Sequence, residues 1–229
     1  MQPDLQTASY GSVAIAPESQ KVLRNTYLLL ALTMVPTILG AAIGIQLAPV
    51  MMASPMITFV VMLASVIGLQ FAIVKFRDSA IGVGLLLLMT FLMGAFLGPL
   101  LNFALQMKNG MQLVGYAAAG TGVIFFGMGS LAATIKRDLA PMGKFLFVGM
   151  LALLVAMVAN MFLQIPALAL TVSTLVIVVF SLYLLFDLNR IIRGGETNYV
   201  IATTGVYISL LNIFTSLLQI LLSVSGDRD

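Results

Sequence analysis

The fold is decided by one stretch, PALALTVSTLVIVVFSLYLLFDLNRIIRGGETNY, which occupies residues 166–199. It opens with about twenty apolar or weakly polar residues, enough for a helix to cross the hydrocarbon core of a bilayer. This run predicts a transmembrane span that ends at Asp187. A carboxylate at that position would lie within reach of hydrocarbon and at a helix C-terminus, where the macrodipole disfavours negative charge. Asp187 is therefore the first functional candidate, with Arg190 three residues further at helical spacing.

The composition places the whole chain in a membrane. Of its 229 residues, 61% are hydrophobic and only 8% are charged, whereas a soluble domain carries about 25% charged residues. The apolar runs cover almost the entire chain and leave no room for a separate soluble domain. Basic residues are scattered singly or in pairs, so the net charge of +3 does not indicate a nucleic-acid-binding surface. We therefore expect an all-α membrane protein in contact with the lipid bilayer and with no nucleic acid.

Seven apolar segments with short connections predict a seven-transmembrane-helix bundle over residues 21–229. The segments cover approximately residues 26–47, 52–75, 79–105, 111–135, 142–163, 166–187 and 202–224. If the N-terminus is cytoplasmic, nine of the eleven basic residues fall on the cytoplasmic side. These nine are Lys21, Arg24, Lys75, Arg77, Lys136, Arg137, Lys144, Arg190 and Arg193. By the positive-inside rule we expect a cytoplasmic N-terminus and a C-terminus on the other side of the membrane.

The first twenty residues, MQPDLQTASYGSVAIAPESQ, are small and polar and have no periodicity. They predict a disordered cytoplasmic tail from Met1 to Gln20. The apolar segment that follows Lys21 and Arg24 is far longer than the apolar core of a signal peptide, so we expect an uncleaved first span.

Small residues indicate where helices could approach closely, because apolar area alone gives helices little reason to associate in lipid. Gly94 and Gly98 are spaced four apart in the third span. The fourth span is richest in glycine, with Gly115, Gly120, Gly122, Gly127 and Gly129. This pattern predicts a bundle with the third and fourth spans near its centre.

One face of the seventh span is polar. It carries Ser209, Asn212, Ser216 and Gln219 at positions i, i+3, i+7 and i+10. Such a stripe needs a polar partner inside a membrane, and Asp187 on the preceding span is the strongest one available. We expect this face to lie against Asp187.

The residues that are absent exclude several kinds of chemistry. The chain has no histidine and no cysteine, so a Ser–His pair, an imidazole or thiolate zinc site and haem ligation by imidazole are excluded. An intramembrane aspartyl protease needs two carboxylates that share a proton, and only Asp187 is embedded in a predicted span. We expect a protein without enzymatic activity, cofactor or metal site.

Several strings resemble the Bax-inhibitor-one family, in its bacterial YccA-like branch. They are VLRNTYLLL (22–30), FLGPLLN (96–102), RDLAPMGKFL (137–146), ANMFLQIPAL (159–168), LYLLFDLNRIIRGGETNYV (182–200) and YISLLNIFTSLLQILL (207–222). The resemblance implies a seven-helix bundle in the bacterial inner membrane, with a central helix wrapped by the others. In such a membrane the C-terminus expected on the far side by the positive-inside rule is periplasmic.

The resemblance implies two kinds of function. YccA-like members modulate FtsH, a membrane-anchored AAA protease. Other members are pH-sensitive calcium leak channels gated by two aspartates, with a basic residue near the end of the second span. The first aspartate matches Asp187, the second position carries Ser209, and the basic position matches Lys75 or Arg77. The gating pair is thus incomplete in this chain.

Three hypotheses follow. The chain is a regulator that binds FtsH, with the tail from Met1 to Gln20 as the handle that the protease grips. Alternatively, it is a pH-sensitive calcium or cation leak that uses Asp187 with Lys75, Arg77 or Arg190. Thirdly, it is a structural bundle in which Asp187 and Arg190 only cap a helix. For Asp187 itself, we expect that it latches the last two spans together through Ser209 and a nearby cation, on the face that includes Asn212.

Overall fold

The computed structural model describes residues 16–226, which form eight helices and their connections, without a strand. The helices are α1 Pro17–Ala53, α2 Pro55–Lys75, α3 Ala80–Phe96, α4 Gly98–Gln106, α5 Gly110–Thr134, α6 Met142–Leu163, α7 Pro166–Ile192 and α8 Tyr199–Gly226. Together α3 and α4 form one span, so seven helical segments of the described chain are long and apolar enough to cross a membrane. The predicted all-α, seven-span fold is confirmed.

Three boundaries differ from the prediction. The first helix begins at Pro17, so residues 17–20 are helical rather than part of a tail, and residues 1–15 lie outside the described part of the chain. The third span is interrupted at Leu97, just before Pro99, a residue that has no N–H to donate to a helix. The sixth span does not end at Asp187, because α7 continues to Ile192.

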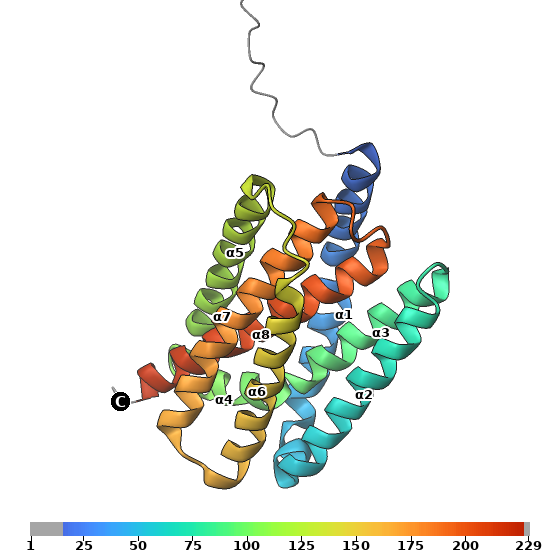
Figure 1. The fold of residues 1–229 in the computed structure, drawn as a ribbon. Coiled ribbons are helices and arrows are strands. Elements are labelled where there is room, and N and C mark those ends of the chain that lie inside the picture. Colours follow the sequence, from blue (N-terminus) through green and yellow to red (C-terminus); the bar gives the residue numbers. More distant parts are fainter. Residues whose placement is uncertain (1–15, 227–229) are drawn as a thin grey trace, which may run out of the picture.

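The spans run alternately up and down, so the start of α1 and the end of α8 lie at opposite ends of the bundle (Figure 1). The connections α2–α3, α5–α6 and α7–α8 share the end at which α1 begins. This places the nine basic residues named above at one end, which we call the charged end. Which side of the membrane the charged end faces stays a prediction from the positive-inside rule.

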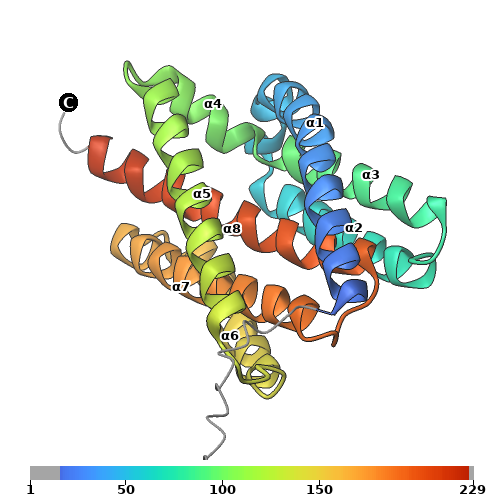
Figure 2. The ribbon, with the colours of Figure 1, turned by 90° about the horizontal axis from the view of Figure 1, so that it is seen from above.

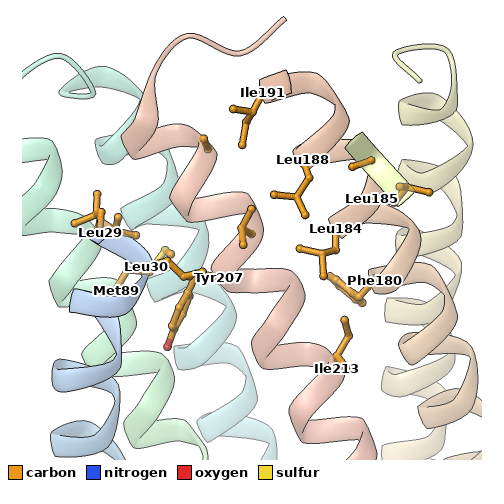
Figure 3. Close-up of a cluster of buried hydrophobic side chains, with 14 of the residues drawn as sticks. Leu29, Leu30, Met89, Phe180, Leu184, Leu185, Leu188, Ile191, Tyr207 and Ile213 are labelled. Carbon is orange, nitrogen blue, oxygen red and sulfur yellow. The ribbon is translucent and has the colours of Figure 1, made fainter. Parts of the chain in front are cut away.

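The centre of the bundle is α8, which packs against α1, α2, α3, α5 and α7 (Figure 2). The prediction of a central fourth span is wrong, because only 11% of the most apolar part of α5 is buried. The corresponding share is 39% for both the α3–α4 span and α7. The core joins α7 and α8 to α1 and α3, and includes Leu184, Leu188 and Tyr207 (Figure 3).

Glycines hold α1 against the α3–α4 span. A Cβ on Gly40 would collide with the carbonyl oxygen of Phe91, and one on Gly44 with that of Ala95. Reciprocally, a Cβ on Gly94 would collide with the carbonyl oxygen of Thr37, and one on Gly98 with that of Gly44. Two small-xxx-small pairs therefore face each other, and only the second was recognised in the sequence. By contrast, Gly115, Gly122 and Gly127 of α5 have open space beside them.

Candidate functional site

Asp187 lies in the last turns of α7 and its carboxylate faces the backbone of α8. A Cβ added to Gly205 would stand 2.7 Å from Oδ2 of Asp187 and 3.2 Å from its Cγ. The absence of a side chain at Gly205 is therefore what admits the carboxylate between the two helices. Asp187 is half-buried and lies five residues before the end of α7 at Ile192.

Ser209 and Asn212, the residues of α8 predicted to take part in the latch, make no hydrogen bond to Asp187 within residues 16–226. Ser209 is buried, at 2% exposed, but no hydrogen bond joins it to Asp187 in residues 16–226. Asn212 donates its side-chain amide to the carbonyl oxygen of Ile208 on its own helix, at 2.8 Å. Gln219, at the far end of the polar stripe, accepts a hydrogen bond from Ser173 of α7 at 2.8 Å. The stripe does face α7 at that end, yet its partner there is Ser173 and not Asp187.

Two of the three candidate cations lie on or just after α2 and make local contacts. The Nζ atom of Lys75 lies 5.6 Å from the centre of the Phe76 ring. Arg77 is ion-paired with the neighbouring Asp78, with Nε and Oδ2 3.5 Å apart. The structure shows no ion pair between either cation and Asp187 within the described chain.

The third candidate, Arg190, lies one helical turn after Asp187 and is engaged by the α7–α8 connection. Its Nη2 is 3.4 Å from Oε2 of Glu196, and its Nε donates to the carbonyl oxygen of Gly195 at 3.1 Å. The ion pair of Arg190 with Glu196 joins the last turn of α7 to the α7–α8 connection. Within the described residues Arg190 is therefore paired with Glu196, and no ion pair joins it to Asp187.

Two asparagines lock the connections at the charged end, and the sequence reasoning missed both. Asn189 is fully buried; its Oδ1 accepts from the backbone of Leu139 at 3.2 Å and its Nδ2 donates to the carbonyl oxygen of Arg137 at 3.3 Å. Asn198 donates to Asp78 Oδ1 at 2.8 Å and to the carbonyl oxygen of Arg77 at 3.1 Å.

A recognisable signal existed for Asn198 alone. Its Oδ1 accepts from the backbone of Val200 and Ile201, as an asparagine at a helix N-cap does.

Arg193 was considered in the sequence only for its charge. In the structure its Nη2 donates to the carbonyl oxygen of Ile135 at 2.6 Å. The charged end is thus a set of connections tied to one another by side-chain hydrogen bonds.

A buried polar cluster lies deeper in the bundle. Tyr207 of α8 is 1% exposed, and its hydroxyl lies 2.8 Å from Oγ1 of Thr37 on α1 and donates to the carbonyl oxygen of Thr90 on α3 at 3.2 Å. These contacts join the central helix to the glycine-packed pair. Through them α8 is hydrogen-bonded to α1 and α3 in the interior of the bundle.

Comparison with known proteins adds the family. The family described as inhibitor of apoptosis-promoting Bax1 matches residues 19–226. The chain belongs to this family. A Neisseria meningitidis protein of uncharacterised function is 41% identical, over 97% of this chain and all of the relative. A Vibrio cholerae protein described as an uncharacterised membrane protein is 40% identical, over 89% of this chain and 90% of the relative.

The YccA proteins of Escherichia coli are also relatives. The protein of strain K12, named modulator of FtsH protease YccA, is 39% identical over 91% of this chain and 93% of its own length. Its counterpart in strain CFT073, with the same identity and coverage, is named inner membrane protein YccA. The resemblance to the YccA-like branch is confirmed, and the chain is a multi-pass protein of the bacterial inner membrane.

Proposed function

We propose that this chain binds a membrane-anchored AAA protease of the FtsH type and modulates its activity, without catalytic chemistry of its own. The observation that carries the proposal is the 39% identity, over nine-tenths of both chains, to a protein named modulator of FtsH protease. The family match extends over residues 19–226, which is the whole helical bundle. Binding is therefore proposed for the whole membrane domain and not for an isolated motif.

The charged end supports the proposal as a docking surface. Its three connections are held by Asn189, Arg193 and Asn198 through bonds to backbone carbonyls or a neighbouring carboxylate. A surface that is already ordered loses little conformational freedom when a partner binds. The same end carries most of the basic residues, and by the positive-inside rule it would face the cytoplasm, where an AAA domain lies.

The segment before α1 is the proposed handle for the protease. The sequence predicted a handle from Met1 to Gln20, and we now limit the proposed handle to the residues before Pro17. The reason is that α1 begins at Pro17 and that Ser19 is buried, with its Oγ close to Gly194. Residues 2–15 lie outside the described part of the chain, and their deletion leaves Pro17 and Ser19 in the sequence.

Co-purification tests the proposal. The tagged full chain, extracted from inner membranes in mild detergent, is expected to retain the protease. Deletion of the gene for this chain should change the rate at which the protease degrades a membrane substrate in cells. The variant that lacks residues 2–15 should still retain the protease but should have a longer lifetime in cells. If neither the protease nor a change in substrate turnover is found, the proposed function is wrong. If only the lifetime is unchanged, the handle is wrong.

The calcium leak is not the function that we propose. Calcium prefers six to eight oxygen ligands, and residues 16–226 contain no group of three or more acidic side chains that could hold a metal ion together. Asp187 faces Gly205, and the position of the family's second aspartate carries Ser209. No contact of Asp187 favours this alternative.

A further inference from the structure

An apolar groove lies between α1 and α5. It has a volume of about 710 Å³ and is lined by Tyr27, Leu30, Ala31 and Met34 of α1, by Phe125, Phe126, Gly129 and Ser130 of α5, and by Leu210 of α8. The only polar side chains in this lining are Tyr27 and Ser130, and the hydroxyl of Ser130 already donates to the carbonyl oxygen of Phe126. The groove therefore offers almost entirely apolar surface.

Other helices of this chain leave the groove open. The central helix α8 contributes Leu210 to its lining, while α4 packs against both α1 and α5 at the end of the bundle remote from the charged end. Tyr27 and Phe125 touch edge to face, with ring centres 5.7 Å apart. Since Phe126 is 72% exposed, this wall faces the hydrocarbon of the bilayer directly.

The rim of the groove nearest the charged end carries unpaired positive charge. Arg24 is on the same face of α1 as the groove, because Arg24, Tyr27, Ala31 and Met34 are spaced i, i+3, i+7 and i+10. Arg24 is exposed and makes no ion pair within the described chain. On the other wall, Lys136 and Arg137 follow the end of α5 and are also exposed.

Tyr27 adds a hydrogen-bonding group at this rim. Its ring lines the groove, and its hydroxyl makes no hydrogen bond within the described residues. Tyrosine is enriched where hydrocarbon meets headgroups, because its ring is apolar and its hydroxyl is polar. The groove thus combines an apolar trough with a cation and a hydroxyl one helical turn apart at its upper edge.

We propose that this groove binds an anionic phospholipid, with an acyl chain between α1 and α5 and the headgroup phosphate at Arg24 and Tyr27. The charge at the rim selects a lipid over an apolar helix of a partner protein, which would leave the arginine without a counter-charge. An arginine and a phosphate form short, charge-assisted hydrogen bonds. By the positive-inside rule the rim faces the cytoplasmic leaflet, where anionic headgroups attract such residues.

Native mass spectrometry of the full chain tests this site. The purified protein is mixed with phosphatidylglycerol or with phosphatidylethanolamine of the same acyl chains, and bound lipids are counted. We expect phosphatidylglycerol to be retained in preference. Arg24→Gln should weaken that binding about fivefold, the equivalent of the ~1 kcal/mol that one basic residue contributes near an anionic surface. Lys144→Gln, at the same end but on α6 outside the groove, should leave it unchanged.

Two variants that change the size of a side chain but not its charge distinguish lipid binding in the groove from binding by surface charge alone. Ala31→Phe fills the groove without changing any charge and should abolish the preferential binding, whereas Leu32→Phe places the same ring on the adjacent position outside the groove lining and should preserve it. The proposal is overturned if Ala31→Phe binds phosphatidylglycerol as the wild type does. Equal losses in Arg24→Gln and Lys144→Gln, or no preference for the anionic lipid, would overturn it as well.

Discussion

Asp187 and Gly205 form the residue-scale contact on which the candidate site depends. The carboxylate approaches the backbone of α8 because position 205 has no side chain, and nearby the Arg190–Glu196 ion pair joins the last turn of α7 to the α7–α8 connection. An intramembrane carboxylate is costly and is retained in proteins mainly for function. Gly205, which the sequence analysis did not single out, is the residue of α8 that borders the carboxylate.

Gly205→Ala is expected to destabilise the protein. The added methyl group would stand 2.7 Å from Oδ2 of Asp187, and such overpacking costs about 1–3 kcal/mol. Thermal unfolding in detergent measures the loss, and combining Gly205→Ala with Asp187→Ala should recover part of it, because the second change removes the colliding group.

Gly115→Ala is the matched control for this change, since nothing lies within 4 Å of a Cβ at that position. It should be neutral or slightly stabilising, because alanine is favoured over glycine in a helix by about 0.5–1 kcal/mol. A Gly205→Ala protein as stable as the wild type would show that the carboxylate does not press against α8.

The element-scale feature is the packing of α1 on the α3–α4 span through Gly40, Gly44, Gly94 and Gly98. Each of the four would place a Cβ against a backbone carbonyl, and a carbonyl within a helix cannot rotate away as a flexible side chain can. In lipid, where apolar contact alone gives helices little drive to associate, this close fit supplies much of the attraction between the two segments.

Gly94→Ala is therefore expected to cost more than Gly205→Ala, about 3 kcal/mol or more, because the backbone of Thr37 has to move. The measurement is the folded yield and the unfolding temperature of the purified variant. Gly122→Ala on α5 serves as the control, since its Cβ would enter open space. Similar stability of the two variants would contradict the glycine-packed contact.

At the scale of the whole molecule, the main feature is that the basic residues are concentrated at one end of the bundle. Nine of the eleven basic residues lie at the charged end, where the connections are bonded together by Asn189, Arg193 and Asn198. The proposed protease-binding surface, the start of α1 that the proposed handle precedes and the rim of the lipid groove are all located there. A single orientation in the membrane would place all three in the cytoplasm.

Reporter fusions test that orientation. A reporter that is active only in the periplasm should be active when fused after Asp229 and inactive when inserted in the connection 193–198, because the basic residues retain that connection on the cytoplasmic side. The opposite pattern would reverse the orientation and would remove the AAA domain from reach of the charged end.

The sequence by itself determined the seven spans, the distribution of charge and the prominence of Asp187. These properties are local: the hydropathy of about twenty consecutive residues decides whether a segment spans the bilayer, whatever the rest of the chain does. The family resemblance followed from equally local strings of residues, and the comparisons confirmed it.

Only the tertiary structure decided which helices are central and what Asp187 meets. The glycines of α5 and those of the third span look alike in sequence, yet Gly122 borders open space and Gly94 a carbonyl oxygen. A period of 3.6 residues identifies the face of a helix but not the height at which a neighbouring helix crosses it. The carboxylate therefore meets Gly205, one turn before the expected Ser209, because that height depends on the packing of α7 against α8 as a whole.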